Sequence, residues 1–132
     1  MVGLYVIIVI RVLHLMAKIF TANELTNEVI DYIYRCGGFA WRQNSGGVYD
    51  KNIGVFRTSS KKGVSDVLAC YKGRIFCIEV KIGKDKLSQE QQGFLKNIEN
   101  VRGRVYVAQY FDDFKFWFNS KKLEIDNRLD DD

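Results

Sequence analysis

The 132-residue chain contains no proline, a single histidine and three cysteines. The cysteines, Cys36, Cys70 and Cys77, show no CxxC spacing, and the only histidine is His14, so the sequence does not favour a structural zinc site. A single histidine also excludes most nucleophile schemes that depend on a histidine base. An odd number of thiols at apolar positions is typical of a reduced protein, so we expect an intracellular location.

The chain also lacks a long apolar segment. The most prominent apolar run, VGLYVIIVI at residues 2–10, ends at Arg11 and is too short to span a bilayer. No positive charge precedes it, as one would in a secretory signal. Three interpretations of residues 1–20 stay open: an extra strand, a membrane-touching segment, or an upstream extension of the gene with Met16 as the true start. We favour the extension and expect no membrane partner.

The charge of the chain is unevenly distributed. The formal net charge is +4, but the last eight residues contain four Asp and one Arg, so the other 124 residues carry +7. A basic body of this kind suits a polyanionic partner, and we expect the acidic tail to lie outside the binding face. The alternative is that the charge serves solubility only. With 47% hydrophobic and 27% charged residues, the composition is that of one globular domain.

Two capping-box patterns mark the starts of helices. Thr21 with Glu24, and Ser88 with Gln91, match the pairing of an N-cap hydroxyl with an acid or amide three residues later. An apolar stripe follows the first pair, and two glycines end it. The predicted helices cover residues 22–36 and from about 88 to 101.

The remaining predicted elements are mostly strands. Strands are expected at residues 39–42, 53–57, 64–71, 74–82 and 104–110, with polar loops at 43–51 and 58–63. Residues 111–118 are ambiguous between a short helix and a strand, and fraying is expected after Lys121. The order αβββαβ predicts an α/β fold, a mixed sheet flanked by helices, over residues 21–119, with an acidic tail at 120–132.

Three charged residues interrupt the apolar segment GVSDVLACYKGRIFCIEVK. If Lys72-Gly73 forms the two-residue turn of a hairpin, Asp66 lies directly opposite Glu79, with the two Cβ atoms roughly 5 Å apart. Glu79 and Lys81 are two residues apart and share a face of the strand. The pattern therefore predicts a cluster of two carboxylates and one lysine on one side of the hairpin.

Like charges that face each other across a sheet destabilise it unless something compensates them. A proton shared by the two carboxylates, a salt bridge to Lys81, or a divalent cation would each do so. Oxygen-rich sites suit Mg²⁺ or Mn²⁺. The structural alternative is a Glu79–Lys81 salt bridge with Asp66 merely near the start of its strand, and geometry alone does not choose between them.

At this point the sequence resembles a known family. Asp66 followed by Glu79-Val80-Lys81 has the spacing of the PD-(D/E)XK nuclease superfamily, and the closer resemblance is to its VRR-NUC (virus-type replication-repair nuclease) family. Four blocks carry it in order over roughly residues 22–115: GGFAWRQNSG, KKGVSD, FCIEVK and KLSQEQQGFL. Where the family often has Pro before the first motif acid, this chain has Ser65.

The resemblance implies a restriction-endonuclease-like core and a metal-dependent nuclease that cuts DNA. Small stand-alone members of the family, many of them from phages, look like dimers that act on branched DNA such as Holliday junctions. By this resemblance we expect a homodimer that acts on branched or structured DNA in the cytoplasm of a host cell. The alternative is a non-catalytic nucleic-acid-binding module on the same fold, and a third is a basic structural protein that neither binds nor cuts DNA.

Chemistry and resemblance together assign roles to the acidic cluster. Asp66 and Glu79 are expected to hold Mg²⁺ or Mn²⁺, with the backbone carbonyl of Val80 completing the site. Lys81 is expected to orient a water molecule or to stabilise charge in the transition state.

The resemblance also implies further residues around this cluster. A fourth acidic group is expected from the first helix, and Glu24 and Glu28 both stay open, since Glu24 also has a capping role. Gln91 is expected near the active site in addition to its capping role. The expected phosphate contacts are Arg42, Asn44, Ser45, Lys61, Lys62, Lys84 and Lys86. The aromatic segment 114–118 either packs in the core, as is usual, or forms a stacking or dimer face.

Overall fold

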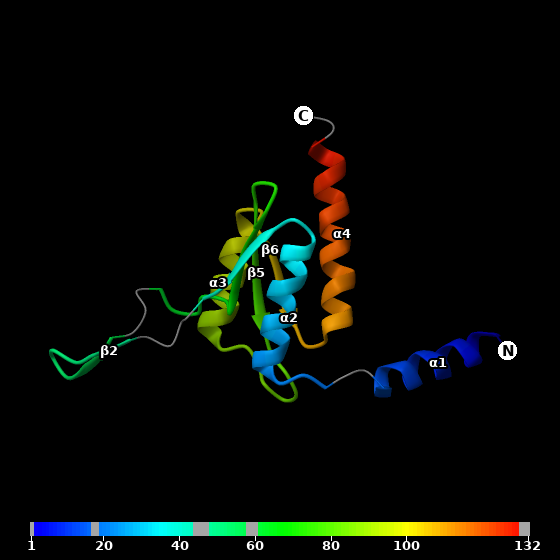
Figure 1. Cartoon of the computed structure of the whole chain (residues 1–132), viewed down its shortest axis with the longest axis horizontal. Coiled ribbons are helices and arrows are strands. Elements are labelled where there is room, and N and C mark those ends of the chain that lie inside the picture. Colours follow the sequence, from blue (N-terminus) through cyan, green and yellow to red (C-terminus); the bar gives the residue numbers. More distant parts are fainter. Residues whose placement is uncertain (1, 17–18, 44–47, 58–60, 130–132) are drawn as a thin grey trace.

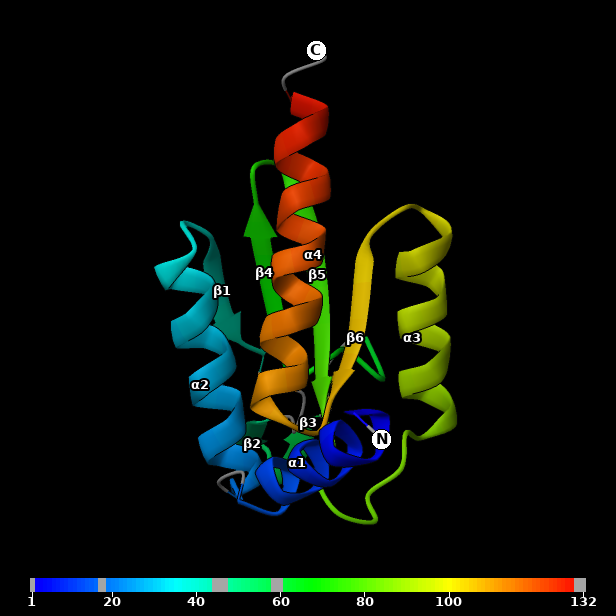
Figure 2. The ribbon, with the colours of Figure 1, turned by 90° about the vertical axis from the view of Figure 1, so that its right-hand side faces the viewer.

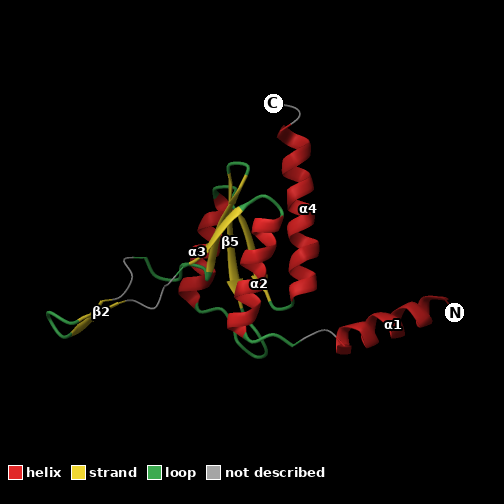
Figure 3. Ribbon diagram, viewed as in Figure 1, coloured by secondary structure: helices red, strands yellow, loops and turns green. Residues whose placement is uncertain are grey.

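The structure is a computed structural model, and it describes residues 2–16, 19–43, 48–57 and 61–129 (Figure 1). Within these residues two helices are followed by five strands, and helices and strands alternate only after the fifth strand; Figure 3 shows the two kinds of element by colour. In chain order the elements are α1 (Val2–Met16), α2 (Ala22–Arg35), β1 (Phe39–Arg42), β2 (Val48–Asp50), β3 (Val55–Arg57), β4 (Val67–Tyr71), β5 (Arg74–Val80), α3 (Gln89–Asn100), β6 (Arg104–Ala108) and α4 (Phe111–Leu129).

A mixed four-stranded sheet forms the centre of the molecule. Its strand order is β1-β4-β5-β6, with β1, β4 and β5 antiparallel and β6 parallel to β5. The order α2-β1-β4-β5-α3-β6 is the predicted αβββαβ order. Strand β3 matches the strand expected at residues 53–57 but pairs with β2 outside the main sheet, and α4 takes the helical alternative for residues 111–118; the structure adds α1 and β2. The predicted α/β class is therefore confirmed, and the architecture is compatible with a restriction-endonuclease-like core.

The turn between β4 and β5 is the predicted two-residue turn. Lys72 and Gly73 both have positive φ, 46° and 80°, as a type I′ turn requires. The ladder that follows ends at the pair Val67↔Ile78, in the predicted register. The next residue on each strand is therefore one of the two acidic residues of the predicted cluster.

One face of the sheet carries the hydrophobic core. Helices α2 and α4 pack on this face, and Figure 2 shows α4 crossing in front of the strands. Phe76 of β5 packs against Phe118, with ring centroids 5.2 Å apart, and Tyr106 stacks on Trp117 at 4.6 Å. Phe114 and Phe118 are fully buried, so most of the aromatic segment 114–118 packs in the core, as expected. Phe116 is the exception and points to solvent with 80% of its surface exposed.

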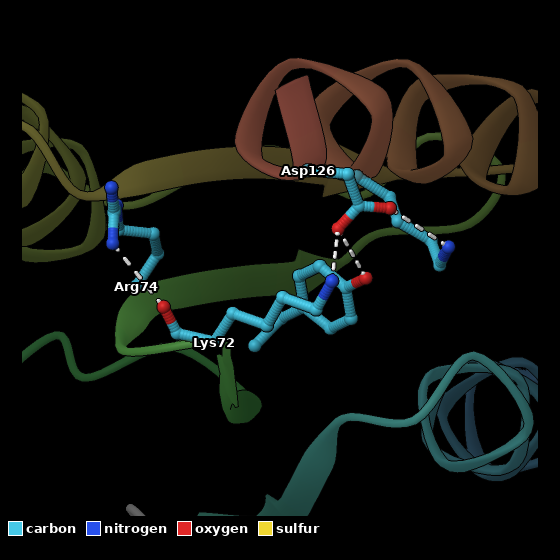
Figure 4. Close-up of polar contacts among 5 residues, drawn as sticks. Lys72, Arg74 and Asp126 are labelled. Carbon is cyan, nitrogen blue, oxygen red and sulfur yellow. Dashed lines mark hydrogen bonds and ion pairs between the residues drawn. The ribbon is translucent and has the colours of Figure 1, made fainter. Parts of the chain in front are cut away.

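Helix α4 corrects the prediction of fraying after residue 121. It continues as a helix to Leu129, because Ile125 is fully buried and Asp126 binds the β4–β5 hairpin. Asp126 accepts hydrogen bonds from Tyr71 Oη at 2.7 Å and Lys72 Nζ at 2.8 Å, as Figure 4 shows. The hydrogen bond from Lys72 has the largest effect and that from Tyr71 the next, and together they hold the pKa of the Asp126 carboxyl well below its usual range. The first residues of the acidic segment therefore belong to the folded domain.

Both predicted capping boxes are present. The Thr21 hydroxyl accepts from the Glu24 amide at 3.1 Å, and the Ser88 hydroxyl accepts from the Gln91 amide at the same distance. In each case the side chain of the third helical residue accepts from the N-cap amide in return. Helix α2 ends before Gly37, whose φ of 88° suits glycine.

Two other segments differ from their predictions. Residues 2–16 form the helix α1, so the extra strand considered for the first twenty residues is wrong. Residues 48–50 form strand β2, paired with β3, where a polar loop was predicted, because a turn over residues 51–54 folds the chain back. Figure 1 shows both segments standing away from the sheet. Among the described residues, no helix is long and apolar enough to cross a bilayer.

Candidate active site

The acidic residues lie on the sheet face opposite the core, at the end of the sheet away from the β4–β5 turn. Side chains alternate along a strand, so Asp66 and Glu79 take the face opposite to Val67, Ile78 and Val80, which belong to the core. The end of strand β1 lies beside Asp66, because the backbone amide of Gln43 donates to the Asp66 carbonyl at 2.8 Å.

Asp66 is held by the strand next to it. Its Oδ2 atom accepts a hydrogen bond from the backbone amide of Val80 at 2.8 Å. This bond joins the start of β4 to the end of β5 and fixes the carboxylate beside the other acidic residue. The sequence suggested a role for the Val80 carbonyl as a metal ligand, whereas the contact seen here comes from the Val80 amide.

Glu79 is the fully buried charged residue of the site, with 0% of its surface exposed. Its Oε1 atom accepts from Gln91 Nε2 of α3 at 3.3 Å. Its Oε2 atom is buried and has no hydrogen-bond partner among the described residues. Gln91 therefore has both roles considered for it, because its Oε1 caps α3 while its Nε2 binds the site.

The electrostatics of the pair follow from this burial. Burial first, then the hydrogen bond that a protonated Glu79 makes to Asp66 and the negative charge of Asp66, raise the pKa of the Glu79 carboxyl to about 9. The positive charge of Lys81 acts in the opposite direction. With both carboxylates ionised, Glu79 Oε2 has no donor to accept from within the described part of the chain. A proton or a cation between the two acids would satisfy it.

The chain matches no known family model and no curated protein. Its resemblance to the VRR-NUC family therefore stays a prediction that rests on the four sequence blocks. The site has to be judged on its geometry and chemistry.

The donor set suits a hard divalent cation. Carboxylate oxygens are the ligands that Mg²⁺ and Mn²⁺ favour, and one oxygen of the pair is buried with no partner in the described part of the chain. The described residues contain no group of three or more acidic, histidine or cysteine side chains placed to hold a metal. The structure therefore does not bring Glu24 or Glu28 to the pair. Glu24 is exposed and serves the capping box, and Glu28 is half-buried on the same helix.

The predicted phosphate contacts are spread over several segments. Arg42, at the end of β1, donates to Asn27 Oδ1 at 3.1 Å and reaches the Asn23 carbonyl at 3.4 Å. These acceptors are neutral, so the two contacts leave the positive charge of Arg42 in place near the N-terminal end of α2. The exposed lysines of this set are Lys61, Lys62, Lys84 and Lys86. Asn44 and Ser45 lie outside the described residues.

The loop before β4 packs closely on α3. Gly63 has a φ of 77°, and a Cβ atom there would collide with the Glu90 carbonyl in the first turn of α3. Glycine at this position therefore lets the 61–63 turn lie against the helix that carries Gln91. The loop lysines, Lys61 and Lys62, are in this way brought to the same end of the sheet as the acidic pair.

Two features of the site escaped sequence reasoning. The burial of Glu79 depends on α3 and on the sheet around it, and no local pattern encodes it. The exposed aromatic side chains of β1, Phe39 and Trp41, share the sheet face of the acidic pair. The alternation of β1 contained this signal, but it could be used only after the β1–β4 register was known.

Proposed function

We propose that the protein is a metal-dependent DNA endonuclease that hydrolyses phosphodiester bonds, with Asp66 and Glu79 holding Mg²⁺ or Mn²⁺. The observation that carries this proposal is the buried Glu79 carboxylate beside Asp66, one oxygen of which has no hydrogen-bond partner among the described residues. A buried carboxylate beside a second, half-buried one destabilises a fold unless a proton or a cation compensates the charge. A buried acid with a raised pKa, such as Glu79, is typical of a functional site.

The surrounding residues support defined roles. The Val80 amide orients Asp66, and Gln91 orients Glu79, so both carboxylates are preorganised. A bound divalent cation supplies Lewis-acid polarisation of a phosphate and lowers the pKa of a bound water. Lys81 lies close enough to influence Glu79 and would stabilise negative charge that develops on the phosphate.

The resemblance supports two further expectations. Branched DNA as the preferred substrate and a homodimer as the active unit both come from the family, as does a metal-ligand role for the Val80 carbonyl. They stay predictions beside the chemistry of the acidic pair. The +7 charge of the chain outside its last eight residues suits DNA as the partner.

The test is cleavage of labelled branched, flapped and linear DNA with Mg²⁺, with Mn²⁺ and with EDTA. Asp66→Asn, Glu79→Gln and Lys81→Ala should each lower the cleavage rate by about 100-fold or more. Two matched controls remove an acid and a lysine from the exposed side of α3: Glu99→Ala and Lys96→Ala.

The outcomes separate the candidate functions. Metal-dependent cleavage that disappears in the site variants and persists in the two controls supports the nuclease. Cleavage at the wild-type rate by Asp66→Asn or Glu79→Gln refutes the assigned site. DNA binding without cleavage in either metal would instead favour the non-catalytic binding module, and neither binding nor cleavage would favour a structural protein.

A further inference from the structure

The sheet face that carries the acidic pair is only partly covered. Helix α3 packs against β6 at one side of this face, while α2 and α4 cover the opposite face. At the β1 side, three aromatic rings form a continuous surface that we call the aromatic shelf: Tyr34 at the end of α2, and Phe39 and Trp41 of β1. The ring centroids are 5.9 Å apart for Tyr34–Phe39 and 5.6 Å for Phe39–Trp41.

The shelf is open to solvent. Phe39 is 58% exposed and Trp41 is 38% exposed, although each points to the same side of the sheet as buried Cys77. The shelf borders Ile75, which is 40% exposed, and exposed Cys70. Contiguous exposed aromatic surface of this kind marks an interaction site more often than a solvated surface.

The shelf is continuous with the acidic pair. Trp41 lies two residues before Gln43, whose amide binds the backbone of Asp66. The Trp41 Nε1 atom donates to Gln43 Oε1 at 3.2 Å, which fixes the indole ring. Two residues of a strand span about 7 Å, and one strand of B-form DNA advances about 3.4 Å per nucleotide. Measured along the strand direction, Trp41 is therefore displaced from Asp66 by about two nucleotide steps, and Phe39 by about four.

We propose that the aromatic shelf stacks on unpaired bases of the DNA strand that the acidic pair cleaves. The shelf would make the protein select DNA with exposed bases over a continuous duplex, and this inference rests on the proposed function. Aromatic rings stack on any base, whatever its identity, whereas in a duplex the base faces are already stacked on each other.

The charge of the surface favours DNA as the occupant. On this sheet face the shelf is bordered by the uncharged residues Leu68, Cys70 and Ile75 and, at its Trp41 end, by Asp66 of the acidic pair, where a bound cation would offset the negative charge that a phosphate meets. The body of the protein is basic outside its last eight residues. A second copy of the chain, the other occupant that an apolar surface would suit, would bring an equally basic body to the same place.

The test measures binding without cleavage, by the full chain in EDTA. Three fluorescent DNAs of matched sequence are compared: a single strand, a duplex with an internal bubble, and a continuous duplex. Trp41→Ala and Phe39→Ala should weaken binding to the first two by roughly 5- to 150-fold, the range of one base–aromatic stack. Binding to the continuous duplex should change by less than about twofold, since electrostatics dominates it.

Three controls make the test specific. Trp41→Phe keeps a ring and should retain most of the affinity for single strands. Phe116→Ala removes an exposed ring from the outer surface of α4 and should have no effect. The chain has two tryptophans, and only Trp41 lies on the shelf, so DNA-induced quenching of tryptophan emission should disappear in Trp41→Phe.

The results distinguish this proposal from the proposed function. Ring-dependent binding without any cleavage in Mn²⁺ supports the shelf but refutes the nuclease. Metal-dependent cleavage together with wild-type binding of single strands by both alanine variants refutes the shelf alone. An equal loss on all three DNAs also refutes it, as does sedimentation showing that the alanine variants dissociate a dimer.

Discussion

Replacing Glu79 by glutamine tests the acidic pair without any DNA. In the metal-free protein the pKa of Glu79 is raised to about 9, whereas the ordinary value is 4.5. Between these values the folded protein holds a proton that the unfolded chain has released. The free energy of unfolding must therefore fall as the pH rises from about 4.5 to about 9, and level off above that range.

The size of the effect follows from the linkage slope. One proton difference is worth at most about 1.4 kcal/mol per pH unit, so the wild-type protein should lose up to about 2.7 kcal/mol between pH 6 and pH 8. The substitution Glu79→Gln keeps the volume of the side chain but leaves no proton to lose. We therefore expect this variant to lack the slope and to be more stable than the wild type at pH 8.

Urea denaturation followed by circular dichroism, in EDTA and again in Mn²⁺, measures this directly. Mn²⁺ should restore the stability of the wild type at pH 8, because a divalent cation between the acids replaces the proton. It should not stabilise Glu79→Gln to the same extent. Equal pH slopes in the two proteins would show that Glu79 is ionised, and the absence of Mn²⁺ stabilisation in the wild type would refute the metal site.

Three further predictions follow from other contacts. Gln91→Ala and Ser88→Ala should each destabilise the protein by about 1 kcal/mol in urea denaturation, because each removes part of the α3 cap. Only Gln91→Ala should also slow DNA cleavage, because only Gln91 binds Glu79. Equal cleavage rates for the two variants would contradict this role. Gly63→Ala should lower the free energy of unfolding by about 1–3 kcal/mol, because the new methyl group meets the Glu90 carbonyl, and a neutral result would show that the loop can shift. Asp126→Asn should lower the melting temperature at neutral pH. Because the Asp126 pKa is depressed in the folded state, this difference from the wild type should shrink as the pH falls below about 3.8, and a difference that persists in acid would refute the role of its charge.

The predicted parts of the fold are those that local chemistry fixes. Lys72-Gly73 sets the two-residue turn, and side-chain alternation then determines which residues face each other on β4 and β5. The two capping boxes depend on residues three apart in the chain, so they too could be recognised without a structure. Short-range geometry of this kind leaves few alternatives.

The mistaken predictions concern segments whose structure depends on distant partners. Helix α4 continues to Leu129 because Ile125 enters the core and Asp126 binds Tyr71, and neither partner is near in sequence. The 43–51 segment contains a strand only because a later segment pairs with it. The hydrophilic composition of this segment predicts a loop as long as the strand that pairs with it is not known.

From the sequence by itself, a two-residue turn at Lys72-Gly73 and the period of a strand predicted Asp66 opposite Glu79, and the ladder has that register up to the pair Val67↔Ile78 next to them. Only the tertiary structure decided what surrounds them. Helix α3 brings Gln91 to Glu79 and leaves β1 uncovered, so one acid is buried while the aromatic rings beside the pair stay in water. Burial depends on how whole elements pack, and that packing is set by contacts between residues far apart in the chain.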